Sequence, residues 1–180
     1  MVKQPIKGKG KLKKKRKTVV KRKHSEFGTS QLEKDFARDF LDKLGLKYVY
    51  QYKAEDIGRY FDFAIAADND YPYEMVLTEG VNSIKQGGLF RPSFIIEVDG
   101  DYHHANPDEY KDEDLNPMQK HNKRVDSQKD YWCGMHCIPL LRIWEHDIRK
   151  NQKKVFEEIG KYSAEARKKM ERKKIFTKPH

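Results

Sequence analysis

Apolar side chains recur at helical spacing near the start of the chain and at alternate positions further along it. Residues 29–44 are predicted to form a helix, because their apolar positions lie mostly three or four residues apart: Leu32, Phe36, Phe40, Leu41 and Leu44. Ser30 and Glu33 have the spacing of a capping box at its start. Gly45 stands where such a helix would end.

Period-two patterns predict strands after this helix. In one of them Phe61, Phe63 and Ile65 alternate with Tyr60, Asp62 and Ala64, and another is the most apolar segment of the chain. The four predicted strands cover residues 47–53, 59–66, 93–100 and 138–143.

The segments between these strands differ in character. Residues 67–92 are rich in Asp, Asn, Pro and Gly, so we expect a long loop or insertion, with a short helix near 74–85. Residues 101–117 form an acidic loop, 118–134 a helix, and 146–174 a long basic helix. The order helix, three strands, helix, strand, helix predicts an α/β fold in which helices flank a small mixed sheet.

The net charge of +10 is unevenly placed along the 180 residues. Residues 1–24 hold twelve lysines and arginines and no acidic residue, and residues 149–180 hold twelve against four acidic residues. The segment between them has twenty-four acidic and fourteen basic residues. Basic ends of this kind are suited to a polyanion, through phosphate contacts and counterion release. A solubilising or localising tail on an ordinary domain is the alternative.

These charges divide the chain into three expected parts. Residues 1–24 are a low-complexity basic tail predicted to be disordered, 25–150 are the folded domain, and 151–180 are a basic helical extension. The residues expected to contact nucleic acid are Lys13, Lys14, Lys15, Arg16 and Lys17 in the tail and Lys168, Lys169, Arg172 and Lys173 in the extension.

Several protein classes do not fit the sequence. It has no apolar run of the roughly 18 to 20 residues that a membrane span needs. The basic N-terminus is not followed by the apolar stretch of a secretory signal. Two cysteines, Cys133 and Cys137, are too few for a disulfide scaffold and fit a reducing compartment. We therefore expect no membrane partner and a cytoplasmic location, associated with the nucleoid of a bacterial or phage-infected host.

Carboxylates mark the candidate chemistry. Glu97 and Asp99 lie two residues apart on an apolar strand, so their side chains leave the same face of the sheet. Asp62 lies in the middle of another strand, and it would join them if the two strands were neighbours. Buried carboxylates need a compensating charge, and oxygen ligands suit Mg²⁺ or Mn²⁺. The alternative is that each acid is solvated or bound in an ion pair.

Four motifs, in this order, resemble the very-short-patch-repair endonucleases and the related EDxHD homing endonucleases of the PD-(D/E)xK superfamily. They are F-D-F at 61–63, I-I-E-V-D-G-D-Y-H-H at 95–104, N-x-x-x-D at 122–126 and L-L-R-I-W-E at 140–145. The resemblance covers residues 29–150. It implies a restriction-endonuclease-like three-layer core, and it makes residues 25–150 a nuclease domain.

The resemblance also implies roles for individual residues. Asp62 matches the metal-binding aspartate, and Glu97 with Asp99 matches the second acidic motif, without the usual superfamily lysine. We therefore expect a metal site of Asp62, Glu97 and Asp99. The remaining catalytic positions are a histidine acting as general acid or base, an aspartate on the following helix and a glutamate on the first helix: His103 or His104, Asp126 and Glu33.

Arg124 and Lys129 are weaker candidates for a positive charge near the phosphate. The family's structural zinc is not expected, because Asp101 and Asn106 stand where cysteines would be needed. Cys133, His136 and Cys137 are better interpreted as packing residues at a helix end.

The predicted function is a Mg²⁺-dependent (or Mn²⁺-dependent) endonuclease that hydrolyses phosphodiester bonds in double-stranded DNA. A free-standing homing or mobile-element nuclease is the preferred form, and a nicking repair enzyme is the alternative. A nuclease acting on structured RNA, or a non-catalytic nucleic-acid-binding module on a nuclease fold, also stays open. A homodimer is compatible with the sequence.

Overall fold

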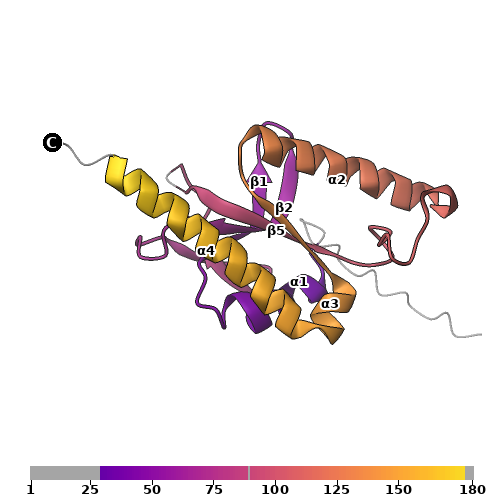
Figure 1. Ribbon diagram of the computed structural model, residues 1–180, viewed down its shortest axis with the longest axis horizontal. Helices are drawn as coiled ribbons and strands as arrows, with labels where there is room; N and C mark the ends of the chain where they lie inside the picture. The colour runs from indigo at the N-terminus through magenta and orange to yellow at the C-terminus, as the bar shows by residue number, and fades with distance from the viewer. Residues whose placement is uncertain (1–28, 89, 177–180) are drawn as a thin grey trace, which may run out of the picture.

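A four-stranded mixed sheet lies at the centre of the computed structural model, which describes residues 29–88 and 90–176 (Figure 1). Its strands follow the order β1 (Tyr48–Ala54), β2 (Arg59–Ala66), β5 (Pro92–Asp99) and β6 (Leu140–Trp144). The first three are antiparallel to their neighbours, whereas β6 runs parallel to β5. A parallel pair needs a crossover connection, and the helix α2 (Pro117–Met135) supplies it. The predicted α/β class and mixed sheet are therefore confirmed.

The remaining helices follow the predicted order. The first is α1 (Gln31–Phe36), which continues as the single π-turn η1 (Ala37–Leu41). Its capping box is present, because the Ser30 hydroxyl accepts from the Glu33 amide at 3.2 Å and the Glu33 carboxylate accepts from the Ser30 amide at 2.9 Å. A short 3₁₀ turn, η2 (Asp112–Asp114), precedes α2.

One predicted long helix is divided into two. The segment expected at 146–174 forms α3 (Glu145–Lys150) and α4 (Gln152–Phe176), and Asn151 between them leaves the helical region at φ −128°. None of the described helices combines the length and the apolar character that a membrane span requires.

Helices cover both faces of the sheet (Figure 1). On one face α1, η1, α3 and α4 pack over an aromatic and aliphatic core that we call the α1-side cluster; its central members include Phe36, Phe63 and Ile96. On the other face α2 covers the α2-side cluster, around Phe61, Ile95 and Trp132. The first half of α4 belongs to the core as well, because Val155 and Ile159 are fully buried in the α1-side cluster. The predicted extension therefore shares its beginning with the folded domain.

The prediction of a short helix at 74–85 is wrong. This segment forms a hairpin of β3 (Met75–Thr78) and β4 (Val81–Ile84) beside β1. Its two-residue turn places Glu79 and Gly80 at φ 49° and 85°, the left-handed conformation that tight hairpins require. Val81 packs into the α1-side cluster and Ile84 into the α2-side cluster, so the hairpin closes the edge of the sheet.

Candidate active site

The strands β2 and β5 separate at a fork, and two of the predicted site acids fill it. The antiparallel register ends at the pair Phe63–Ile96. Beyond this pair, the Asp62 amide donates to Glu97 Oε1 at 3.1 Å, and the Val98 amide donates to Asp62 Oδ2 at 2.8 Å. The two carboxylates thus replace the backbone hydrogen bonds that would have continued the sheet. The sequence predicted that Asp62 would lie near Glu97 if their strands were neighbours, and β2 and β5 are paired.

The neighbouring strand β1 is distorted at the same level. Tyr50 packs into the α1-side cluster, whereas Tyr52 packs against the α2-side cluster. Between them Gln51 has a φ of 56° although it is buried in a strand. Backbone strain of this kind in the middle of an element is typical of functional sites. The β1–β2 hairpin is therefore distorted beside the fork. Phe61 and Phe63, the two neighbours of Asp62, pack into different clusters.

Glu33 connects the first helix to this distortion. Its Oε2 accepts hydrogen bonds from the Tyr50 hydroxyl and from Gln51 Nε2, each at 2.9 Å. The side chain is buried, and its charge is close enough to raise the pKa of Asp62. The structure therefore places Glu33 beside the distorted part of β1 and near Asp62.

Lys129 reaches the fork from α2. Its Nζ lies 2.5 Å from Glu97 Oε2 and 5.3 Å from the centre of the Phe61 ring. Burial lowers the pKa of Lys129, but the charges of Glu97 and Asp62 outweigh burial and raise it. One largely buried ammonium group thus faces several carboxylates.

The two fork carboxylates are harder to ionise than ordinary ones. Burial, and then the charges of Glu97 and Glu33, raise the pKa of Asp62 well above its ordinary value. Burial also raises the pKa of Glu97, and the nearby charge of Lys129 offsets only part of this effect. Ionised Asp62 therefore lacks a full compensating charge at the fork.

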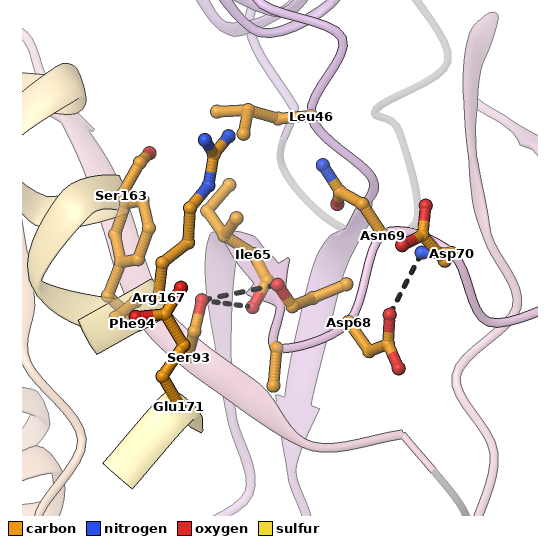
Figure 2. A pocket seen from close by; sticks show the side chains of 13 residues that line it. Leu46, Ile65, Asp68, Asn69, Asp70, Ser93, Phe94, Ser163, Arg167 and Glu171 are labelled. Carbon is orange, nitrogen blue, oxygen red and sulfur yellow. Dashed lines mark hydrogen bonds between the residues drawn. The ribbon is translucent and has the colours of Figure 1, made fainter. Parts of the chain in front are cut away.

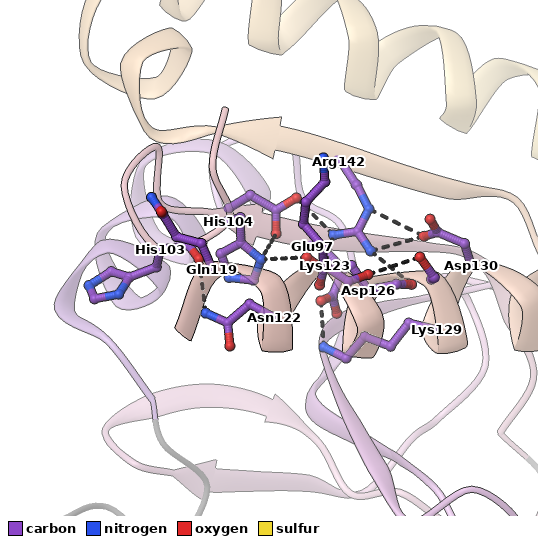
Figure 3. A network of polar contacts seen from close by, with 12 residues as sticks. Glu97, His103, His104, Gln119, Asn122, Lys123, Asp126, Lys129, Asp130 and Arg142 are labelled. Atoms are coloured by element: carbon purple, nitrogen blue, oxygen red, sulfur yellow. Dashed lines mark hydrogen bonds and ion pairs between the residues drawn. The ribbon is translucent and has the colours of Figure 1, made fainter. Parts of the chain in front are cut away.

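A second polar network lies on the same side of the sheet, between β5, β6 and α2 (Figure 3). Asp99 is almost fully buried, and its Oδ2 accepts from Arg142 Nη1 at 2.8 Å. His104 Nδ1 donates to Asp126 Oδ2 at 2.9 Å and lies 3.5 Å from Asp99 Oδ1. Arg142 also donates to Asp130 Oδ1 at 2.9 Å. Among the described residues, Asp99, His104 and Asp126 can place ligand atoms within 4.8 Å of one another.

The charges of this network perturb His104 and Asp126 in opposite directions. Burial lowers the pKa of His104, but the hydrogen bond to Asp126 and the charges of Asp99 and Asp126 more than compensate, so its pKa lies above the ordinary 6.5. Burial raises the pKa of Asp126, yet the hydrogen bond and the charge of His104 and the charge of Arg142 lower it overall. The pair therefore favours a protonated imidazole beside an ionised carboxylate.

The structure distinguishes the two candidate histidines. His104 points into the network, whereas the ring of His103 is exposed and points away from it (Figure 3). The His103 ring packs edge-on against Tyr102, with 5.4 Å between the ring centres, and its carbonyl accepts from Asn122 Nδ2 at 2.9 Å. The turn that follows β5, with His104 N bonded to the Gly100 carbonyl at 3.0 Å and Ala105 at φ 52°, determines this orientation.

The predicted metal set is divided between the two networks. Glu97 contacts Asp62 and Lys129, while Asp99 contacts Arg142 and His104. A divalent cation and ion pairing were the two alternatives for compensating Glu97 and Asp99, and the structure places a side-chain cation beside each acid, Lys129 and Arg142. Arg142 was not among the predicted site residues, although an arginine inside the apolar strand motif L-L-R-I-W was a signal for a buried ion pair.

The predicted nucleic-acid contacts that the structure describes lie away from these two networks. Lys168, Lys169 and Arg172 are exposed on α4, and Lys173 belongs to the same helix. This helix covers the face of the sheet opposite to α2, which carries Asp126 and Lys129. The other predicted contacts, Lys13, Lys14, Lys15, Arg16 and Lys17, fall with the whole 1–24 tail outside the described residues.

Comparisons with protein-family models, with curated proteins and with solved structures found no match to this chain.

Proposed function

We propose that the protein is a Mg²⁺-dependent endodeoxyribonuclease built on a restriction-endonuclease-like core. The observation that carries the proposal is the fork between β2 and β5, where Asp62 and Glu97 replace the hydrogen bonds of the sheet. The very-short-patch-repair resemblance implies active-site acids at these two positions. The mixed sheet with helices on both faces is compatible with the three-layer core that the same resemblance implies.

Lys129 supports the same proposal. The PD-(D/E)xK pattern implies a lysine two residues after the acid, where this chain has Asp99. Lys129 approaches Glu97 from α2 instead and brings an ammonium group to the fork. In a buried site such a group would hold a phosphate oxygen more strongly than it would in bulk water.

The donor set at the fork fits a hard divalent cation. Asp62 faces the carboxylates of Glu97 and Glu33 in a half-buried position, so its ionised form calls for a further cation. Carboxylate oxygens are the ligands that Mg²⁺ and Mn²⁺ prefer. We assign Asp62 and Glu97 as the residues that would hold the ion. When bound, Mg²⁺ would neutralise charge on the phosphate and make a water molecule more acidic.

His104 is suited to the proton transfer. Asp126 fixes the ring through Nδ1, and the raised pKa keeps a proton on the imidazole near neutral pH. Protonated Nε2 would donate its proton to the departing 3′ oxygen while water adds to the phosphorus and releases a proton to solvent, from which His104 is reprotonated. The products are a 3′ hydroxyl and a 5′ phosphate. General acid catalysis of this kind contributes about 10²- to 10⁴-fold.

Cleavage of supercoiled plasmid in Mg²⁺, Mn²⁺ or EDTA tests the proposal. We expect metal-dependent cutting by the wild type and by Asp70→Asn, a matched change at an exposed aspartate. Asp62→Asn should abolish cutting, and His104→Ala should slow it about 10²- to 10⁴-fold. Metal-independent cutting, or full activity in Asp62→Asn, would contradict the proposal. Nicked or linear product would also separate a repair-type enzyme from a homing-type one.

A non-catalytic nucleic-acid-binding module is the second candidate. The observation that favours it is that Lys129 and Arg142 already compensate Glu97 and Asp99, so these acids have a structural role without a metal. This candidate predicts salt-sensitive DNA binding without cutting, unchanged in Asp62→Asn.

A further inference from the structure

A cavity of about 530 Å³ lies at the end of β5 that is remote from the fork. It is bounded by the last turn of α2, the start of β5 and the exposed side of α4. Its volume is in the range of small-ligand sites, which extends from about 300 to 1,000 Å³. Its most informative lining residues are aromatic, cationic or thiol-bearing: Tyr52, Phe90, Trp132, His136, Arg91, Lys169 and Cys137.

The aromatic rings form a continuous wall. Tyr52 lies 5.8 Å from Phe90 and 6.5 Å from Trp132, measured between ring centres, and Trp132 lies 4.3 Å from His136 at an interplanar angle of 34°. Phe90 and Trp132 are nearly buried, whereas Tyr52 is half-buried and His136 is exposed. Ring surface is therefore available to a planar ligand, with a packed support behind it.

Asp56 holds this wall in place from outside the lining. Its two carboxylate oxygens each accept from Trp132 Nε1 at 2.8 Å, and Oδ2 lies 3.4 Å from His136 Nε2. Trp132 and His136 are thereby fixed relative to each other. The wall is thus organised before any ligand arrives.

The positive charge of the lining favours an anionic ligand. Arg91 and Lys169 are exposed at the cavity, and its lining contains no Asp or Glu. Arg91 belongs to the segment 25–148, where acidic residues outnumber basic ones, and Lys169 belongs to the basic segment 149–180. The Arg91 guanidinium is also positioned by the Gly88 and Phe90 carbonyls, which accept from Nη1 at 2.9 and 2.8 Å.

The cavity on the other side of α4 provides a contrast. It has a volume of about 440 Å³, and Arg167 shares its lining with Asp68, Asp70 and Glu171 (Figure 2). Three carboxylates around one arginine do not favour a phosphate. Of these two cavities, only the first combines aromatic rings with cations and has no carboxylate among its described lining residues.

We propose that the first cavity binds one nucleotide of a single-stranded DNA segment. The base packs against Tyr52 and His136, and the phosphate contacts Arg91 and Lys169. Stacking on aromatic side chains beside a cationic surface is the general mode of single-strand binding. Ser93 at the cavity and Glu97 at the fork are four residues apart on β5, a span of about 13 Å. The inference rests on the proposed function in one respect, namely that the protein's ligand is DNA.

Cys137 provides a native probe of this cavity. It is exposed in the lining, whereas Cys133 is buried and burial raises its pKa to about 12. Iodoacetamide should therefore modify Cys137 selectively. We would measure this rate in EDTA, with and without an oligo(dT) of about 12 nucleotides, a length that matches single-strand binding sites. At ten times the Kd, occupancy should slow the reaction about tenfold.

Two controls sharpen the experiment. Lys169→Glu should remove most of the protection at the same oligonucleotide concentration, whereas Lys161→Glu, an exposed lysine on α4 outside the lining, should retain it. A blunt duplex of the same length should not protect Cys137. Unchanged reactivity of Cys137 under saturating oligo(dT), or equal protection in Lys169→Glu or by the duplex, would overturn the assignment.

The outcome is separable from that of the nuclease proposal. Oligo(dT) should protect Cys137 in Asp62→Asn as well as it does in the wild type, because the cavity and the fork share no residue. Cutting without protection would refute the cavity alone, and protection without cutting would refute the nuclease alone.

Discussion

Lys129 Nζ and Glu97 Oε2 lie 2.5 Å apart, and their side chains are only 12% and 2% exposed. The lysine comes from the crossover helix α2 and the glutamate from the central strand β5. The pair therefore joins the helix to the sheet at the point where β2 and β5 separate. A buried pair of this kind is far more sensitive to the loss of one partner than to the loss of both.

Lys129→Met should destabilise the protein by about 3–5 kcal/mol, because Glu97 would then be buried without a compensating charge. Combining it with Glu97→Gln should recover much of that loss, since no buried charge would be left unpaired. Urea unfolding of the two single variants and the double variant measures the coupling free energy. Additive losses in the double variant would show that the two side chains do not interact in solution. Both single variants should also lose nuclease activity.

Asp62→Asn should make the protein more stable while it abolishes cutting. The pKa of Asp62 is raised in the folded state, so ionising this carboxyl disfavours folding at any pH above its unfolded value. An asparagine keeps an oxygen that can accept from the Val98 amide but carries no charge. Thermal unfolding at pH 7.5 should give a higher Tm, with roughly 2–4 °C for each kcal/mol gained.

The pH dependence provides the control for this prediction. Wild type should lose stability relative to Asp62→Asn as the pH rises from the unfolded pKa through the folded one, and the difference should then stay constant. An equal Tm for the two proteins at pH 7.5 would contradict the raised pKa. A large decrease in the variant would instead assign Asp62 a structural role.

The parts of this fold that depend on neighbouring residues in sequence were predictable. The capping box of Ser30 and Glu33 and the alternation around Phe63 act within a few residues, and both are present. The β3–β4 hairpin was not found, because its Glu79-Gly80 turn is a weak signal and a helix competes with short strands in such a segment. Its strands are stabilised by packing beside β1, a contact between segments that are distant in sequence.

The sequence named the acids that meet at the candidate site but did not pair Glu97 and Asp99 with their cations. Lys129 meets Glu97 across 32 positions and Arg142 meets Asp99 across 43, and no local pattern reports such distances. The choice between His103 and His104 depends on one turn after β5. Glu97 and Asp99 belong to different networks because each pairs with a different cation. The alternation of side chains along a strand does not predict where those cations lie.

Gln51→Gly should leave stability nearly unchanged and reduce activity. Glycine would relieve the left-handed backbone at φ 56°, which costs about 1–2 kcal/mol for other residues, but it would remove the hydrogen bond to Glu33. A buried hydrogen bond to a charged group contributes about 1.5–3 kcal/mol, so the two effects largely cancel. Gln51→Ala keeps the strain and loses the bond, so it should be clearly less stable than Gln51→Gly. Equal stability of the two variants would show that the strain is absent.

His146→Gln should make stability less dependent on pH between about 5.5 and 8.5. The hydrogen bond to Asp101, at 2.9 Å, and the charges of Asp147 and Asp101 raise the pKa of His146 above 6.5, against the effect of burial. A raised histidine pKa adds stability below the unfolded value, and this contribution is lost as the pH rises through the folded one. The wild type should therefore exceed the variant by more at pH 5.5 than at pH 8.5. Because the side chain is 28% exposed, we expect a difference on the order of 0.5 kcal/mol.

Asp101→Asn provides the test of the cause. In that background, the substitution His146→Gln should change the pH dependence much less, because the largest contribution to the raised pKa has been removed. Chemical denaturation of the four proteins at the two pH values gives the coupling directly. A pH dependence that is the same with and without Asp101 would assign the effect to Asp147, which lies 3.5 Å from His146 Nε2. Greater stabilisation by His146 at pH 8.5 than at pH 5.5 would contradict the raised pKa itself.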